Sequence, residues 1–348
     1  MSRASRPSSK PATRACPPER VAVLLVPQFS MIAFAAMLEP LRAANRLSGR
    51  ELYAWSLYSG DGARVAASNG IGIDVDGALE DCPDAELLVV CAGLDPLRGV
   101  TDRRIHAQLR RLARRGATVG AVSTGSFLLA EAGLLDGRRC TVHWEYAPTF
   151  RARHPRLDLV EDLYVIDGPV FCGSGGTAGL DLMLRFVERE HGSELALRVA
   201  EQFIHPRIRA DADRQRMDLS SRYGLHHGKL VAVIRAMQSA LERPLDMTAL
   251  GRRAGLSPRQ VERLFRRHLQ VSPRRFYRRI RLEHGRTLLI QTAAPIVEVA
   301  AACGFESPSH FSRAYRGEFA RTPSEERGRV ARHAAGRRRA GRPAPVLG

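Results

Sequence analysis

Several features that define large classes of proteins are missing from this chain of 348 residues. No apolar run approaches the roughly 20 residues of a membrane-spanning helix, so no membrane span is expected. Residues 1–19 lack the apolar core of a signal peptide, and we expect a disordered leader there. The six cysteines include no CxxC pair, which argues against a zinc site or a disulfide framework and fits a reducing cytoplasm.

Sequence signatures of nucleotide-binding loops are missing as well. Gly173-Ser174-Gly175-Gly176 precedes a predicted helix, yet it is neither a Walker A loop nor a GxGxxG fingerprint. Such a turn either holds an anion at the helix N-terminus or is a plain tight turn. We therefore predict no cofactor and no metal ion.

Positive charge is concentrated in one part of the chain. Residues 206–348 contain 30 lysines and arginines against 12 aspartates and glutamates, whereas residues 1–205 contain 24 of each kind. The whole formal net charge of +18 thus belongs to the C-terminal part. This segregation is typical of nucleic-acid binding, because basic side chains displace the counterions of the phosphate backbone.

Two stretches of the basic region have the pattern of a helix-turn-helix motif. They read DMTALGRRAGLSPRQVERLFRRHL over residues 246–269 and PIVEVAAACGFESPSHFSRAYRGEF over residues 295–319. Gly255 and Gly304 each end a short helix, since glycine tolerates a positive φ. Ser257 and Ser307 then cap a second helix, which begins with proline. The tandem arrangement favours binding to double-stranded DNA over a merely solvated basic surface.

Helical spacing separates a buried face from a DNA-facing side in each second helix. The inward side chains are Val261, Leu264, Phe265 and Leu269 in the first and Phe311, Tyr315 and Phe319 in the second. The outward side chains, predicted to contact DNA, are Arg259, Glu262 and Arg263, followed by Ser309, His310, Ser312 and Arg313. Arginine suits guanine edges, and small polar groups suit phosphates or other base edges. A helix over residues 272–289 is predicted to set the separation of the two motifs.

Strands and helices alternate in the N-terminal half. Apolar runs at 21–26, 86–91 and 117–122 indicate strands buried on both faces, and helices are expected between them. This order predicts an α/β fold with a parallel sheet between helical layers. The expected parts are a leader (1–19), an α/β effector-binding and dimerisation domain (20–205), a linker (206–228), an all-α domain with two helix-turn-helix motifs (229–327) and a disordered basic tail (328–348).

These stretches also resemble known families. LSPRQVERLFRRHLQVSPRRFYRRIRLEHGRTLL and IVEVAAACGFESPSHFSRAYRGEFARTPSEER resemble the AraC/XylS-family DNA-binding domain, over residues 229–327. VAVLLVPQFS, EPLRAAN, AVSTGSFLLAEAGLLDGRRCTVHW and GSGGTAGLDLMLRFV resemble the class I glutamine amidotransferase-like domain of the PfpI-like branch, over residues 21–200. The combination is similar to regulators of glycine betaine, carnitine and arginine catabolism. The resemblance implies a flavodoxin-like sandwich, a homodimer, contact with RNA polymerase and activation of a catabolic operon.

The nucleophile position of the amidotransferase-like domain holds serine instead of cysteine. Ser123 occupies the strand-to-helix elbow, and His143 resembles the superfamily's histidine. A serine nucleophile needs a base with an orienting partner, and none is evident, nor does the sequence match a G-x-S-x-G elbow. We predict no catalytic residue and no enzyme. The alternatives are a hydrolase or amidase with an accessory DNA-binding module, and an architectural DNA binder with an α/β scaffold.

The same turns are instead predicted to line an effector pocket at the carboxyl ends of the strands. The predicted contacts are Phe29, Glu39, Ser123, Thr124, His143, Trp144, Ser174, Gly175, Gly176 and Thr177. Trp144 either packs in the core or presents its ring to a cationic group. Glu39 is predicted to face the cationic group of the effector, and backbone amides near Ser123 and Gly175 are predicted to face its carboxylate. A betaine-like compound or an amino acid carries both groups and fits this arrangement. The sequence thus predicts a cytoplasmic, effector-controlled DNA-binding transcription regulator.

Overall fold

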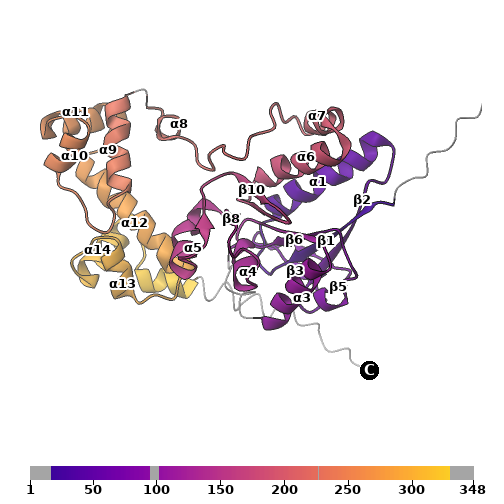
Figure 1. The fold of residues 1–348 in the computed structure, drawn as a ribbon. Coiled ribbons are helices and arrows are strands. Elements are labelled where there is room, and N and C mark those ends of the chain that lie inside the picture. Colours follow the sequence, from indigo (N-terminus) through magenta and orange to yellow (C-terminus); the bar gives the residue numbers. More distant parts are fainter. Residues whose placement is uncertain (1–16, 95–101, 226, 330–348) are drawn as a thin grey trace, which may run out of the picture. The chain divides into compact units, whose positions relative to one another are not determined.

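A computed structural model describes residues 17–94, 102–225 and 227–329. The chain forms two compact units that divide between Gln215 and Arg216, within the stretch 206–228 where the linker is expected (Figure 1). Residues 1–215 are called unit 1 and residues 216–348 unit 2. The leader expected over 1–19 and the tail expected over 328–348 lie outside the described residues, except for 17–19 and 328–329.

The described part of unit 1 contains a seven-stranded sheet with the order β10-β11-β7-β6-β1-β2-β5. Its strands are β1 (Glu19–Leu25), β2 (Tyr53–Ser59), β5 (Gly77–Ala78), β6 (Leu87–Cys91), β7 (Thr118–Val122), β10 (Tyr164–Asp167) and β11 (Val170–Gly173). Two small pairs lie outside it, β3 (Val65–Ala66) with β4 (Gly72–Ile73) and β8 (Arg139–Cys140) with β9 (Asp158–Leu159). β1, β6 and β7 are apolar and largely buried, as predicted for central parallel strands.

Strand β10 departs from the predicted parallel sheet. It runs antiparallel to β11, whereas β1, β2, β5, β6, β7 and β11 pair in parallel. Only Gly168 and Pro169 separate β10 from β11, and a parallel connection needs a crossover of about a dozen residues or more. Gly168 makes the tight turn with a φ of +63°.

Helices cover both faces of this sheet (Figure 1). One layer consists of α1 (Met31–Ser48), α6 (Ala178–His191) and α7 (Ser193–Gln202), and the other of α3 (Arg103–Arg114), α4 (Ser126–Glu131) and α5 (Ala147–Arg153). Alternate residues of β1 enter different cores, with Val23 packed in the first layer's core and Leu24 in the second. The α/β sandwich expected from the sequence is confirmed, although α5 was not predicted.

The described residues of unit 2 form helices and the loops that connect them. Its helices are α8 (Leu219–Tyr223), α9 (Gly228–Gln238), α10 (Met247–Arg253), α11 (Pro258–Leu269), α12 (Pro273–Gln291), α13 (Ile296–Ala302) and α14 (Pro308–Phe319), and residues 323–329 are also helical. Two apolar cores form, one around Ile234 and Phe265 and one around Phe311 and Tyr315. Long helix α12 contributes to both, and α8 lies inside the stretch expected as linker. None of the helices in the described ranges is both long and apolar enough to cross a membrane.

Candidate DNA-binding surface and effector site

The first helix-turn-helix motif comprises α10, a turn at Gly255 and α11. Asp246 begins α10 by accepting a hydrogen bond from the backbone N–H of Ala249 at 2.7 Å. Gly255 has the expected positive φ, +62°. The Ser257 hydroxyl then accepts from Gln260 N at 3.3 Å, while the Gln260 side chain accepts from Ser257 N at 2.8 Å. This reciprocal capping box fixes the start of α11 through local sequence.

The second motif repeats the arrangement with α13, Gly304 and α14. Gly304 has a φ of +66°, and a Cβ there would lie 2.6 Å from the ring of Pro244. Ser307 begins α14 by accepting from His310 N at 3.2 Å. Arg281 of α12 donates to the carbonyl oxygens of Cys303, at 2.7 Å, and Gly304. The turn of the second motif is therefore attached directly to α12.

The buried faces of α11 and α14 match the spacing in the sequence. Val261, Phe265, Phe311 and Tyr315 are at most 1% exposed, and Leu264, Leu269 and Phe319 pack at the edges of the same cores. Arg259, Arg263, Ser309, His310 and Arg313 are exposed, and Glu262 and Ser312 are half-buried. Glu262 also forms an ion pair with Arg266 at 3.2 Å on its own helix, which leaves its carboxylate less available to bases.

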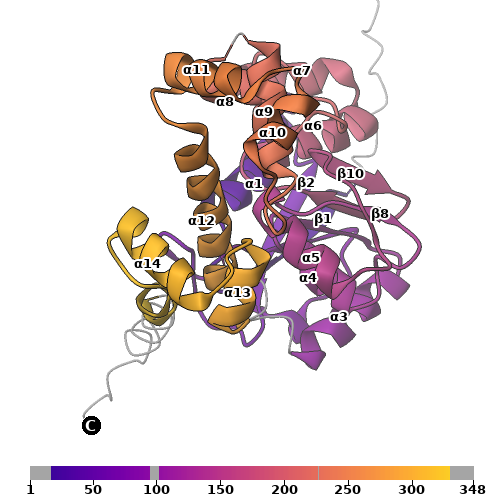
Figure 2. The ribbon, with the colours of Figure 1, turned by 90° about the vertical axis from the view of Figure 1, so that its left-hand side faces the viewer.

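Helix α12 holds the two motifs at its opposite ends (Figure 2). Its cap is Ser272, which accepts from Arg275 N at 3.3 Å, as the serine-proline start predicts. Its 19 residues correspond to a length of about 28 Å at 1.5 Å per residue. Successive major-groove segments on one DNA face lie about 34 Å apart, so α12 has the scale required to place one recognition helix in each.

A depression of about 500 Å³ adjoins the outward face of α11. Its lining includes His227, Lys229, Gln260 and Arg263. Lys229 is exposed at the start of α9 and was not singled out in the sequence. No local pattern could have identified it, because only the packing of α9 on α11 brings this cation beside Arg263.

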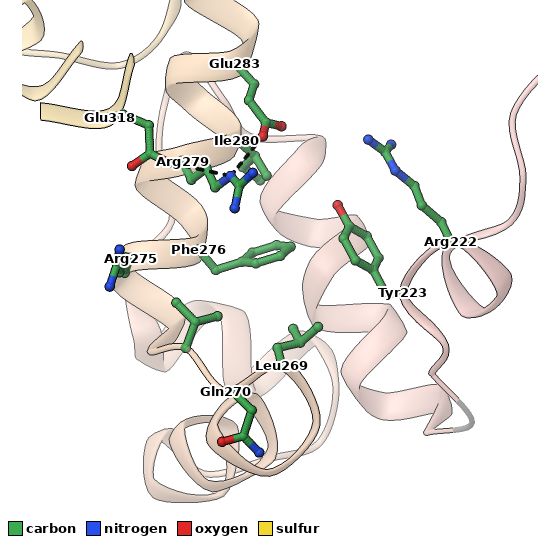
Figure 3. Close-up of a pocket in the computed structure, with 11 residues that line it drawn as sticks. Arg222, Tyr223, Leu269, Gln270, Arg275, Phe276, Arg279, Ile280, Glu283 and Glu318 are labelled. Carbon is green, nitrogen blue, oxygen red and sulfur yellow. Dashed lines mark hydrogen bonds and ion pairs between the residues drawn. The ribbon is translucent and has the colours of Figure 1, made fainter. Parts of the chain in front are cut away.

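A second cavity in unit 2, of about 520 Å³, lies between α8, the end of α11 and α12. Figure 3 shows the rings of Tyr223 and Phe276 close together in its wall, with centroids 5.5 Å apart. Arg279 of α12 forms ion pairs with Glu283 at 3.0 Å and with Glu318 of α14 at 3.6 Å. The Arg279–Glu318 pair is thus a further attachment of the second recognition helix to α12.

In unit 1, most predicted effector residues lie at the carboxyl edge of the sheet. Phe29, after β1, pairs with Gly93, after β6, and the Thr124 hydroxyl donates to the Gly93 carbonyl at 2.7 Å. Ser123, after β7, donates its N–H to Gly173 O at 2.9 Å, and its own carbonyl accepts from His143 N at 3.3 Å. The structure therefore brings together residues 29, 123, 124 and 143 and the turn 174–177.

Ser123 occupies a strained elbow between β7 and α4. Its φ is +64°, a conformation that residues other than glycine rarely adopt and that clusters at functional sites. The side chain is 6% exposed, and its hydroxyl forms no hydrogen bond with the residues that the structure describes. It is thus a polar group held at the sheet edge with its hydrogen-bonding capacity unused by the described chain.

His143 is oriented by its own loop and not by Ser123. Its Nδ1 accepts from Glu145 N at 3.4 Å, so the proton of the neutral ring belongs on Nε2. Burial lowers the pKa of His143, and the nearby Glu145 carboxylate, at 3.7 Å, partly opposes this effect. Within the described chain, no hydrogen bond joins the imidazole to the Ser123 hydroxyl. The ring is therefore placed to donate from Nε2 and lacks the contact of a base with its nucleophile.

The predicted effector residues differ in accessibility. Trp144 is 37% exposed at the start of a short 3₁₀ helix, so the core alternative for its ring does not hold. Thr177 is exposed, and Gly176 is half-buried. Phe29 and Thr124 are fully buried, and Ser174 is 4% exposed. The side chains of Phe29 and Thr124 therefore lie in the interior behind the carboxyl edge, while Trp144 and Thr177 face solvent.

Glu39 is not brought to this edge, contrary to the sequence expectation. It lies in the middle of α1, about 13 Å along the helix axis from the N-cap Ser30. Its carboxylate forms an ion pair with Arg42, one turn further on, at 2.7 Å. Because α1 starts at the carboxyl edge and runs away from it, only its first turn stays close to the elbow.

No cluster of three or more His, Cys, Asp or Glu side chains suited to a metal ion occurs in residues 17–94, 102–225 or 227–329. Each described cysteine is a buried free thiol, and burial raises the thiol pKa of Cys82, Cys140, Cys172 and Cys303.

Comparison with known proteins covers both units. Residues 19–189 match the DJ-1/PfpI family, and residues 250–329 match a helix-turn-helix domain family. The HTH-type transcriptional regulator CdhR of Pseudomonas aeruginosa is 48% identical over 304 residues, which cover 87% of this chain and 90% of that protein. The isonitrile hydratase of Pseudomonas putida is 36% identical over 137 residues, which cover 38% of this chain and 57% of the enzyme.

A solved structure agrees with these matches. The crystal structure of an AraC family transcriptional regulator from Pseudomonas putida is 27% identical, with a TM-score of 0.50. The alignment covers 53% of this chain and 100% of that one. The protein therefore belongs to the family of DNA-binding transcriptional regulators that join a DJ-1/PfpI domain to an AraC-type helix-turn-helix domain.

Proposed function

We propose that this regulator places α11 and α14 in successive major-groove segments of one operator. The observation that supports this is the pair of capped recognition helices, each with an exposed polar face, at the two ends of α12. Arg263 and Arg313 lie on those faces and read bases, while Arg259, Ser309, His310 and Ser312 contact phosphates or other base edges. Glu262 acts mainly by positioning Arg266.

Binding to DNA selected from a random-sequence pool tests this placement. Arg263→Ala and Arg313→Ala should each cost about 1–3 kcal/mol on the selected site and less on random DNA, because base contacts are lost. Arg103→Ala, at an exposed position of α3 in unit 1, is the matched control and should bind like wild type. Wild-type affinity of both recognition-helix variants would reject the proposed contacts.

We further propose that unit 1 binds a small zwitterion, a betaine-like compound or an amino acid. The exposed Trp144 ring and the neighbouring Glu145 carboxylate provide a surface for the cationic group. The N–H groups of Gly175 and Gly176 donate no hydrogen bond within the described chain and, with the Ser123 hydroxyl, suit a carboxylate. Glu39 has no part in this arrangement.

Thermal unfolding of the full chain with betaines, amino acids and sugar phosphates tests the effector class. A zwitterion that binds the folded state raises its stability by about 2.7 kcal/mol at a hundredfold excess over its Kd. Stabilisation by an anionic sugar phosphate, with no response to any zwitterion, would contradict the proposal while leaving DNA binding untouched.

Unit 1 is proposed to act by binding, without turnover. The arrangement of His143, with Nδ1 accepting from its own loop and no contact with the Ser123 hydroxyl, supports this. The likeness to an isonitrile hydratase makes catalysis the competing function. Amidase, esterase, peptidase and isonitrile hydration assays should stay at background, and Ser123→Ala should alter only the effector response. Turnover that disappears in Ser123→Ala would establish the enzyme instead.

We propose a homodimer that works in the cytoplasm and activates a catabolic operon through contact with RNA polymerase. Relatives that are themselves transcriptional regulators support the regulatory role. Sedimentation of the full chain and run-off transcription with purified RNA polymerase test it, and a monomer or a fall in transcript would contradict it.

A further inference from the structure

Residues 205–215, at the end of unit 1, form a strap that is hydrogen-bonded near both of its ends. His205 and Arg209 bind Asp181 of α6, and Gln215 binds the loop before His143. The backbone of Asp211 accepts from Leu163 N at 2.8 Å in between. The chain passes into unit 2 directly after this strap.

Asp181 anchors the first half of the strap and is fully buried. Its Oδ1 accepts from Arg209 N at 2.7 Å and lies 2.8 Å from His205 Nε2. Its Oδ2 accepts from Arg209 Nε at 3.0 Å and Nη2 at 2.7 Å. A buried ion pair adds little net stability compared with apolar packing, but losing one partner is costly. The main effect of this anchor is therefore to hold the strap in one position on α6.

The strap also touches both loops of the candidate effector edge. Arg209 Nη2 donates to the Thr177 hydroxyl at 2.8 Å, and Thr177 ends the turn 174–177. Gln215 Nε2 donates to the Thr141 hydroxyl at 2.9 Å and to Val142 O at 3.1 Å, directly before His143. A displacement of either loop therefore removes a contact that holds the strap.

Ile204 precedes the strap and belongs to the C-terminal cap of α7. Its φ is +53°, and its side chain is 91% exposed. The left-handed turn is enforced at the helix end, where Ile204 N donates to Glu201 O and His205 N donates to Ala200 O, both at 3.0 Å. The strap therefore starts at a fixed helix end, and its own contacts with Asp181 and the two loops hold the residues that follow.

We propose that the strap transmits occupancy of the effector edge to the DNA-binding unit, which rests on the effector site proposed above. A carboxylate held by the N–H groups of Gly175 and Gly176 places negative charge next to the Arg209 guanidinium and favours the attached strap. Without it, the strap detaches more often and adds free chain between the units, up to about 35–40 Å when extended. The effector thereby changes how tightly the movement of unit 2 is restricted.

Hydrogen–deuterium exchange of the full chain without ligand is the first test. Gln215→Ala and Arg209→Lys, which keeps the charge but loses the two-pronged geometry, should raise exchange in 205–215. Exchange should also rise about fivefold in peptides covering 141–144 and 174–177, since coupling is reciprocal. Arg207→Ala is the control, because Arg207 is 70% exposed and pairs with Asp213 inside the strap. Melting temperatures verify that each variant is folded.

Glycine betaine is the probe for the second test. When glycine betaine binds, it should slow hydrogen–deuterium exchange in 205–215 of the wild type about fivefold. The same ligand should slow exchange of this segment less in Arg209→Lys. Binding without added protection of the strap overturns the proposal. So does a strap that detaches in the variants while the loops 141–144 and 174–177 stay unchanged. Failure of every zwitterion to bind would instead overturn the proposed effector class. The exchange rates of the ligand-free variants would still show whether the strap is coupled to the loops 141–144 and 174–177.

Discussion

The backbone of Gly175 lies against the side chain of Ser123, so closely that a Cβ at Gly175 would stand 2.8 Å from Ser123 Cβ. Gly175 also has a φ of +93°, which disfavours any side chain. The turn 174–177 and the elbow can therefore meet only with glycine at this position. The contact joins the segments that follow β7 and β11, which are neighbouring strands of the sheet.

Gly175→Ala should accordingly damage the effector site. The new methyl group forces the turn away from Ser123, and we expect effector affinity to fall about tenfold or more, a cost of roughly 1.4 kcal/mol. Gly176→Ala is the matched control, since its Cβ would meet nothing within 4 Å, although its φ is +56°. Calorimetry with the effector measures both. Equal losses in the two variants would mean that strain, and not the contact with Ser123, sets the affinity.

Trp144→Ala should weaken the effector about tenfold or more, because a desolvated cation–π contact is worth about 2 kcal/mol. Trp144→Phe retains an aromatic face and should lose less. DNA affinity without effector should not change in either variant. Titration calorimetry measures the effector affinity of both variants. If both bind the effector like wild type, the Trp144 ring does not contact the ligand.

Acid should destabilise unit 1 through its buried histidines. His106 is 7% exposed, its Nε2 has no hydrogen-bond partner in the described chain, and burial lowers its pKa although Glu131 opposes this. The unfolded chain, with a pKa of about 6.5, then binds more protons than the folded one. The free energy of unfolding therefore falls as the pH drops below about 6.5 and levels off below the folded-state pKa.

Denaturant unfolding between pH 5 and pH 8, roughly spanning the histidine range, measures this dependence. His106→Gln should show a shallower decline than wild type, because the group that takes up the extra proton is gone. A decline identical to that of the wild type would assign the effect to other histidines, such as His154, whose pKa burial also lowers.

Ala320 ends α14 with a φ of +56°, where a Cβ is unfavourable. Ala320→Gly should stabilise unit 2 by about 1 kcal/mol, since glycine adopts the left-handed region readily. Ala301→Gly, at an exposed position inside α13, is the control and should destabilise by about 1 kcal/mol. Thermal unfolding compares the midpoints of the two variants with that of the wild type. A lower midpoint for Ala320→Gly would contradict the claim that Ala320 is strained.

The sequence by itself determined the local features of this protein. Ser257 with Gln260 specifies the start of α11, and glycine specifies the turns at 255 and 304, because caps and turns depend on neighbours along the chain. The buried stripe of Phe311 and Tyr315 follows from helical spacing alone. The position of Ser123 at the end of β7 likewise follows from the order of strand and helix.

Only the tertiary structure decided which distant groups meet. The axial rise of α1 places Glu39 away from the carboxyl edge that the sequence predicts for it. The neighbourhood of Lys229 and Arg263 and the attachment of Arg209 to Asp181 join separate elements. No sequence period encodes such contacts, because they depend on how elements pack and not on spacing within one element.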